Sequence, residues 1–126
     1  MKPLQLLAAL VLSVAAAAAS ALEIKDYSPE LLAATQAAGR PVALHFHADW
    51  CSTCRAQESV FNALEPDPAF AMTLLVVDYD KEKELKRKLN VRFQSTLIVY
   101  RGKTETARVV GETAAEKLKA ALRSAL

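Results

Sequence analysis

The fold is decided by residues 42–55, which read VALHFHADWCSTCR. Residues 42–47 form a strand-length run in which one face is entirely apolar. The residues that follow the two cysteines carry apolar side chains at helical spacing and predict a helix over 55–64. We therefore expect a strand, a Cys-x-x-Cys motif and a helix in direct succession, which is the setting that redox chemistry requires.

Cys51 and Cys54 are the only cysteines of the chain. Two intervening residues in a first helical turn bring the two sulfurs within bonding distance. The free amides and the dipole at the start of a helix favour a thiolate on the first sulfur, and Arg55 adds a positive charge nearby. We predict that Cys51 attacks a disulfide of another protein and that Cys54, set deeper in the turn, resolves the mixed disulfide.

Other roles for the cysteine pair are weaker hypotheses. Zinc would need further Cys or His ligands at suitable spacing, and only His45 and His47 are present. A purely structural disulfide would close so small a loop that it restrains the unfolded chain little. Two alternatives remain open: a copper(I)-holding protein that uses the soft thiolates, and a redox-inert binding module. Met72 is the only methionine after residue 21, which counts against copper, and no resident cofactor is expected.

The rest of the chain alternates helices and strands with short connections. The further elements expected are an edge strand at 22–24, helices at 29–38 and 81–89, and strands at 73–77, 96–100 and 104–110. A last helix is expected to open with the capping box Thr113–Glu116. Its apolar stripe is formed by Leu118, Leu122 and Leu126. This order predicts an α/β fold with a central mixed sheet, a C-terminal antiparallel hairpin and flanking helices.

Residues 1–21 have the pattern of a secretory signal peptide. Lys2 supplies the positive start, 6–19 is apolar apart from one serine, and 19–21 offers an Ala-x-Ala cleavage site. The apolar run is shorter than the ~20 residues of a spanning helix, so we expect cleavage rather than anchoring. The prediction is a periplasmic domain at 22–126, with membrane contact only through an uncleaved signal.

The charge balance argues against nucleic acid as a partner. Sixteen basic and fourteen acidic residues give a net charge of +2, and no arginine-rich stripe appears. A content of 52% apolar residues argues equally against long disordered tracts. A single globular domain that binds protein thiols and disulfides fits this composition.

The motif ADWCxxCR at 48–55, in this order of elements, resembles the thioredoxin family. The resemblance spans 42–126. Within the family, the chain is most similar to small exported thioredoxin-like proteins and to the C-terminal periplasmic domain of the bacterial electron carrier DsbD, which share this stem, a glutamate at the place of Glu58 and an Asp-Pro segment like 67–70. The resemblance implies a thiol–disulfide oxidoreductase, and suggests a membrane electron carrier as its source of electrons.

The chain departs from the family pattern beneath the cysteines. Thioredoxins keep a buried carboxylate where this chain has His45. Strand alternation places His45 and His47 on one face, so His45 is a candidate base for the Cys54 proton; the alternative is a core histidine bonded to backbone. Glu58, one turn after Cys54, either shares that environment or is an ordinary solvated residue.

A second departure lies before the strand at 96–100. The resemblance aligns Ser95 with the cis-proline of the family, and a cis bond before a non-proline residue costs about 2.5–4 kcal/mol, so we predict a trans peptide. Serine keeps its N–H and adds a hydroxyl, so substrate binding at Ser95 and Thr96 is expected to be altered. Trp50 is expected to pack as a collar beside the sulfurs and to take part, with Ser95 and Thr96, in substrate binding. The alternative for Trp50 is a core position.

Overall fold

The computed structural model describes residues 21–126, so the predicted signal peptide lies, except for its last residue, outside the described part. The elements, in chain order, are β1 (Glu23–Asp26), α1 (Pro29–Ala37), β2 (Pro41–His47), α2 (Ser52–Leu64), a 3₁₀ turn (Pro68–Phe70), β3 (Thr73–Asp78), α3 (Lys83–Lys88), β4 (Thr96–Arg101), β5 (Thr104–Val110) and α4 (Ala115–Arg123). Among these residues no helix has the length and apolar character needed to cross a membrane.

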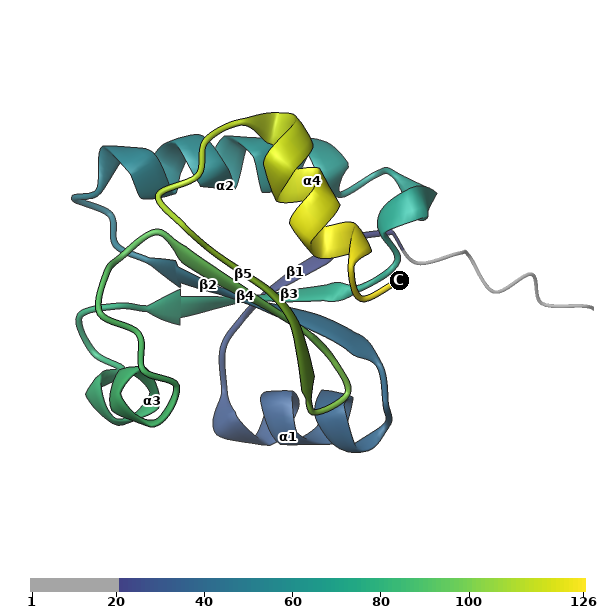
Figure 1. Ribbon diagram of the computed structural model, residues 1–126, viewed down its shortest axis with the longest axis horizontal. Coiled ribbons are helices and arrows are strands. Elements are labelled where there is room, and N and C mark those ends of the chain that lie inside the picture. Colours follow the sequence, from purple (N-terminus) through teal and green to yellow (C-terminus); the bar gives the residue numbers. More distant parts are fainter. Residues whose placement is uncertain (1–20) are drawn as a thin grey trace, which may run out of the picture.

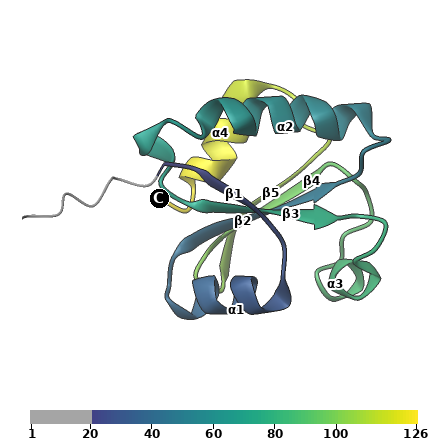
Figure 2. The ribbon, with the colours of Figure 1, turned by 180° about the vertical axis from the view of Figure 1, so that it is seen from behind.

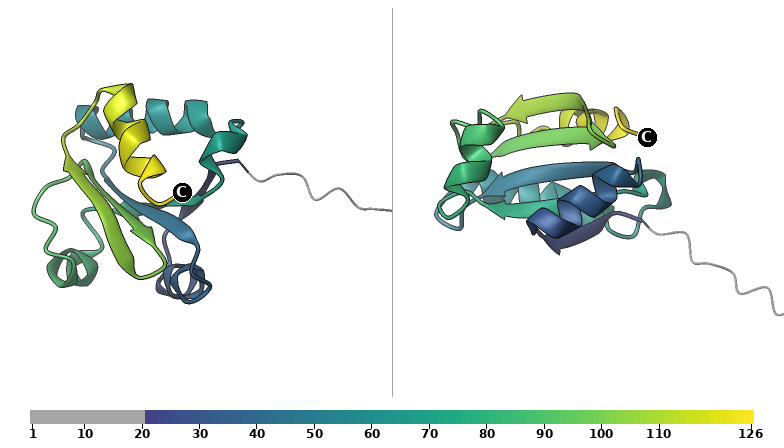
Figure 3. Two further views of the ribbon diagram at one scale, coloured as in Figure 1. Left: turned by 45° about the vertical axis from the view of Figure 1, so that its right-hand side comes forward. Right: turned by 90° about the horizontal axis from the view of Figure 1, so that it is seen from below.

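The strands form one five-stranded sheet in the order β1-β3-β2-β4-β5. β3 pairs in parallel with β1 and β2, whereas β4 runs antiparallel to β2 and β5. The predicted mixed sheet with a C-terminal hairpin is therefore confirmed. α2 and α4 cover one face and α1 and α3 the other (Figures 1 and 2), and the edge-on view of Figure 3 shows the sheet between these two layers.

β2 lies at the centre of the sheet, and its burial explains its composition. Five consecutive residues of this strand are buried, because both faces of the strand are covered by helices. Leu44 and Phe46 pack into the core on the side of α1, whereas Ala43 packs with Phe61 of α2. His45 lies on the same side as Ala43, as the alternation predicted, and its ring meets Phe61 at 5.0 Å between centroids. A polar ring is thus built into the apolar core under α2.

The ends of α1 follow the capping signals of the sequence. Ser28 accepts the backbone N–H of Leu31 at 3.1 Å, and Pro29 occupies the first helical position. Gly39, at φ +68°, provides the left-handed residue that follows the helix. The hairpin turn at Gly102 also needs glycine, because a Cβ there would lie 3.3 Å from the Cα of Gly39.

Two predicted element boundaries in the middle of the chain were displaced. α2 begins at Ser52 rather than at residue 55, because Cys51 acts as its N-cap. α3 spans only Lys83–Lys88, since the N–H of Lys81 is bound by the Asp78 carboxylate in the preceding turn. The edge strand is present, and it extends to Asp26.

The start and the end of the last helix differ from the sequence-based predictions. The predicted capping box at Thr113 is wrong: the N-cap is Ala114, and its N–H is bound by the side chain of Glu112 at 2.9 Å. Leu118 and Leu122 are fully buried as predicted. Leu126 is not part of the stripe, because the helix ends at Arg123 and Leu126 remains 45% exposed.

The difference in burial between Leu122 and Leu126 provides a test of stability. Leu122→Ala is expected to lower the free energy of unfolding by about 2–5 kcal/mol, because it leaves a cavity in the core between α4 and the sheet. Leu126→Ala is the matched control and is expected to change it by less than about 0.5 kcal/mol. Urea titration followed by far-UV circular dichroism measures both, and equal losses would contradict the burial assigned to these leucines.

Candidate active site

Cys51 stands where β2 has ended and α2 begins. Its backbone is extended (φ −94°, ψ 110°), and its sulfur accepts the backbone N–H of Cys54 at 3.1 Å. Its carbonyl accepts the N–H of Arg55 at 3.1 Å, which is the first helical bond. The sulfur therefore serves as the helix cap, at the amide-rich start of α2.

Both cysteines are free thiols, and both are buried. Cys51 retains 5% of its surface, whereas Cys54 retains 0%, so Cys54 is the deeper sulfur as predicted. Cys54 Sγ donates to the carbonyl of Phe46 at 3.8 Å. Burial, and secondarily the hydrogen bond with the Cys51 sulfur, raises the pKa of Cys54 to about 11. At neutral pH Cys54 holds its proton.

Ser95 closes the site from the opposite loop. No cis peptide bond occurs between residues 21 and 126, so the predicted trans peptide at Ser95 is confirmed. The residue has a left-handed backbone (φ +59°), which costs a non-glycine residue about 1–2 kcal/mol. Its N–H donates to the carbonyl of Phe46 at 2.9 Å, the same oxygen that accepts the Cys54 thiol. Proline would lack this N–H, and in this chain the N–H of Ser95 is hydrogen-bonded to Phe46.

His45 is buried next to this site with 1% exposure. Burial lowers the pKa of His45 from 6.5 to about 4, so the ring is neutral at physiological pH. Its Nε2 lies 2.9 Å from Oε1 of Gln57. The ring is therefore bonded to a side chain, rather than to the backbone or to Cys54, whose thiol is directed at Phe46.

Gln57 is the residue that the sequence analysis missed. It is completely buried on α2, and its Nε2 donates to the carbonyls of Ser95 at 3.0 Å and Glu112 at 2.9 Å. Its position carried a signal, because it lies three residues after Cys54 and four before Phe61, on the buried face of the helix. A glutamine among apolar neighbours at that spacing must find polar partners in the core.

Glu58 lies near the surface and pairs with the second histidine. Its Oε2 is 3.2 Å from Nε2 of His47, and its side chain is 50% exposed. Nδ1 of His47 is 3.7 Å from the carboxylate of Asp49. The structure thus places Glu58 with His47 rather than in a direct contact with His45 or Cys54.

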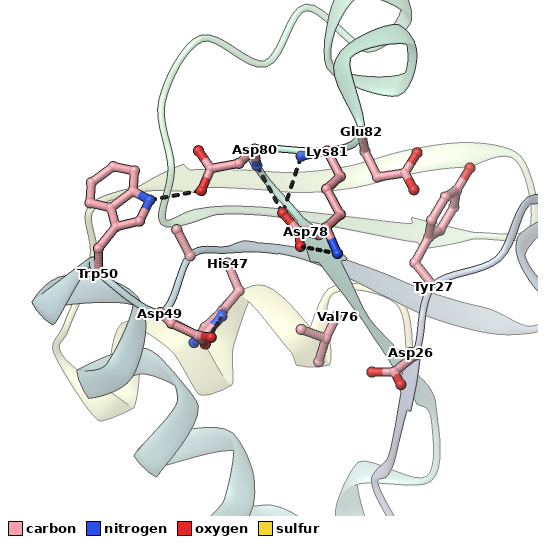
Figure 4. Close-up of a pocket in the computed structure, with 11 residues that line it drawn as sticks. Asp26, Tyr27, His47, Asp49, Trp50, Val76, Asp78, Asp80, Lys81 and Glu82 are labelled. Carbon is pink, nitrogen blue, oxygen red and sulfur yellow. Dashed lines mark hydrogen bonds and ion pairs between the residues drawn. The ribbon is translucent and has the colours of Figure 1, made fainter.

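Trp50 lies at the rim of the site with 61% of its surface exposed, so the alternative that it is a core residue is wrong. Its indole N–H donates to the carboxylate of Asp80 at 2.8 Å (Figure 4). Beyond it opens a pocket of about 510 Å³. The residues lining this pocket are Asp26, Tyr27, His47, Ala48, Asp49, Trp50, Val76, Asp78, Asp80, Lys81 and Glu82.

Thr96, the remaining predicted binding residue, is buried at 2% exposure, and its hydroxyl donates to the carbonyl of Phe93 at 2.7 Å. It therefore supports the loop that carries Ser95. Within residues 21–126, no three His, Cys, Asp or Glu side chains come together as a metal-binding group.

A reduced Cys-x-x-Cys pair that caps a helix at the end of the central strand of a mixed sheet defines a dithiol protein of thioredoxin fold. The family model described as Thioredoxin matches residues 22–124. The chain belongs to the thioredoxin family, whose members are thiol–disulfide oxidoreductases, and the cysteine pair of this chain is Cys51 and Cys54.

Individual relatives agree with this assignment. Thioredoxin 2 of Plasmodium falciparum is 36% identical over 67 residues, which cover 53% of this chain and 43% of that protein. The thiol:disulfide interchange protein DsbD of Ralstonia nicotianae is 35% identical over 105 residues, covering 77% of this chain and 17% of DsbD. The crystal structure of Trxlp from Edwardsiella tarda has a TM-score of 0.75 and 35% identity, covering 79% of this chain and 98% of that one. The chain thus spans under half the length of Thioredoxin 2 and of DsbD.

The lowered pKa of His45 predicts a specific dependence of stability on pH. Between about pH 6.5 and pH 4 the unfolded chain binds a proton at His45 that the folded chain does not, so stability falls as the pH falls through this range. In His45→Phe, this loss should be smaller than in the wild type by roughly 2–3 kcal/mol. Urea titrations at pH 4.5 and pH 7 measure it, and parallel pH profiles of the two proteins would contradict a neutral buried His45.

The unequal burial of the sulfurs predicts selective alkylation. With a pKa of about 11, roughly one Cys54 thiol in 10⁴ is ionised at pH 7, whereas Cys51 lies at the amide-rich start of α2. Iodoacetamide should therefore modify Cys51 about a hundredfold faster than Cys54 in the reduced protein. Peptide mass spectrometry resolves the two sites, and the urea-unfolded protein is the control in which both react. Equal rates in the folded protein would refute the assignment.

Proposed function

We propose that this chain is an exported thiol–disulfide oxidoreductase that reduces the disulfides of partner proteins in the periplasm. The observation that carries the proposal is the arrangement of the dithiol. Cys51 caps α2 with its sulfur on a backbone N–H, while Cys54 is buried and protonated beneath it. The Cys51 sulfur is placed to attack the partner disulfide, and Cys54 remains a thiol until the second step.

In the first step the Cys51 thiolate attacks one sulfur of the partner disulfide. A bond forms between Cys51 and that sulfur, the partner disulfide breaks, and its other sulfur leaves and takes up a proton. In the second step Cys54 loses its proton and attacks the Cys51 sulfur. The Cys51–Cys54 disulfide forms and the second partner thiol is released, so the partner gains two electrons and two protons.

The partner is expected to approach on the side of Trp50. Of the three residues that the sequence analysis assigned to substrate binding, Trp50 has an exposed side chain, whereas Ser95 and Thr96 are buried. The bond from the indole to Asp80 fixes the ring at the rim beside Cys51. We assign Trp50 a contact with the partner, and Ser95 and Thr96 a supporting role.

The oxidised pair must be reduced before a second cycle, and a membrane electron carrier is the proposed donor. The similarity to the thiol:disulfide interchange protein DsbD supports exchange between thiols and disulfides as the way in which the pair is reduced. The signal-peptide pattern of residues 1–21 supports export, and an oxidising compartment supplies the disulfides that such a protein would reduce.

A variant that stops after the first step tests the proposed activity. Cys54→Ser is expected to accumulate a mixed disulfide between Cys51 and its partner, because the resolving sulfur is absent. Purification from a periplasmic extract under non-reducing conditions, followed by mass spectrometry, identifies the adduct. Cys51→Ser is the matched control and should capture nothing. The absence of any adduct with Cys54→Ser would overturn the proposed function.

Export is tested separately. The full chain produced in a Gram-negative bacterium is expected in the periplasmic fraction with Leu22 as its first residue, because the signal peptide has been removed. N-terminal sequencing of the fractionated protein measures this, and a chain that begins at Met-Leu22 is the control that should stay in the cytoplasm. An intact N-terminus on a cytoplasmic protein would contradict the proposed localisation.

A further inference from the structure

The amide of Gln57 joins three parts of the chain that meet at the active site. It lies fully buried on α2, accepts from the ring of His45 on β2, and donates to Ser95 and Glu112 in two separate loops. All three distances are between 2.9 and 3.0 Å, so each is a normal hydrogen bond. A buried side chain that bonds three separate segments helps to determine where those segments lie.

The orientation of the amide follows from its partners. The carbonyls of Ser95 and Glu112 can only accept, so the NH₂ group of Gln57 must face them. Its oxygen therefore faces His45, and the neutral imidazole must carry its proton on Nε2. The two carbonyls thus fix the orientation of the amide, the amide fixes the tautomer of His45, and Nε2 of His45 is not free to accept a proton from a cysteine.

Ser95 is held on both sides of its peptide. Its N–H donates to Phe46 at 2.9 Å, and its carbonyl accepts both Gln57 at 3.0 Å and the N–H of Gly111 at 3.0 Å. The left-handed backbone of Ser95 is unfavourable for a residue with a side chain, so it persists only where neighbouring groups impose it. The carbonyl bond from Gln57 is one of the contacts that do so.

We propose that Gln57 is a positioning residue, which holds the Ser95 backbone beside the dithiol for the attack by Cys54, while His45 donates to its amide oxygen. This inference rests on the proposed resolving role of Cys54. Ser95 N–H and the Cys54 thiol share the carbonyl of Phe46, so the N–H lies next to the buried sulfur.

The position of Ser95 matters in the second step of the reaction. Cys54 must then lose its proton in a buried environment that penalises a thiolate. The backbone at Ala48, and secondarily at Ser95, opposes this penalty and lowers the pKa of Cys54. The Ser95 N–H lies beside the sulfur because both groups donate to the carbonyl of Phe46. If Ser95 moves away, the Cys54 thiolate loses one of the two backbone groups that oppose the burial penalty, and resolution of the mixed disulfide slows while the attack by Cys51 does not.

The test compares Gln57→Met, which keeps the approximate volume and removes all three bonds, with the wild type. Phe61→Leu is the matched control, because Phe61 is equally buried one turn further along α2 and makes no side-chain hydrogen bond. Amide hydrogen exchange by NMR reports on Ser95 and Gly111. Decay of a preformed Cys51–glutathione adduct, followed by mass spectrometry across pH, reports on Cys54.

In Gln57→Met, exchange at Ser95 and Gly111 should rise about tenfold more than in the rest of the sheet, and adduct decay should slow about tenfold with a pH profile shifted upward. In Phe61→Leu, exchange should change uniformly and the pH profile should stay in place. Equal behaviour of the two variants would overturn the proposal. If Gln57→Met does not fold, Gln57→Leu, which also lacks both donors, takes its place.

A spectroscopic measurement on the wild type checks the role of His45. Its ¹⁵N spectrum should show the neutral Nε2–H form, and an Nδ1–H form would overturn the assigned amide orientation. A wild-type adduct that never resolves would instead refute the proposed function, and the exchange of Ser95 and Gly111 would still decide whether Gln57 holds this loop.

Discussion

The bond from the N–H of Cys54 to the sulfur of Cys51, at 3.1 Å, ties the chemistry of this protein to its fold. A helix begins with backbone amides that have no partner within the helix, and here a sulfur atom satisfies one of them. The same contact sets the start of α2 at Ser52 and leaves Cys54 in the first turn, where it is buried. Capping, helix register and the unequal burial of the two thiols are therefore consequences of one local arrangement.

The central position of β2 explains the polar chemistry beneath the dithiol. Because both faces of this strand are covered, the His45 side chain has no route to solvent and must be neutral and hydrogen-bonded. Gln57 supplies that bond and extends it to the carbonyls of Ser95 and Glu112. Where thioredoxins have a buried carboxylate and a cis-proline, this chain has a neutral network and a serine backbone held by hydrogen bonds.

Much of this structure could be predicted from local patterns. The alternation along 42–47 placed His45 and His47 on one face of the strand, and the Cys-x-x-Cys spacing placed the deeper sulfur at Cys54. Features that depend on tertiary contacts could not be predicted in this way. Thr113 is a residue type that commonly caps helices, yet the N-cap is Ala114, whose N–H is bound by Glu112. Leu126 keeps the helical spacing beyond the point at which the helix has ended. The hydrogen bonds of Gln57 join positions far apart in the chain. The sequence could indicate only that Gln57 lies on the buried face of its helix.

The most direct test of the account is whether Cys51 and Cys54 form a reversible disulfide with each other. The reduced protein is equilibrated in glutathione buffers of graded potential, acid-quenched and measured by intact mass. We expect one transition, in which the protein loses two hydrogen atoms and the ratio of oxidised to reduced protein changes tenfold for about every 30 mV. A protein that acquires only glutathione adducts, or that does not change across the whole range, would contradict it.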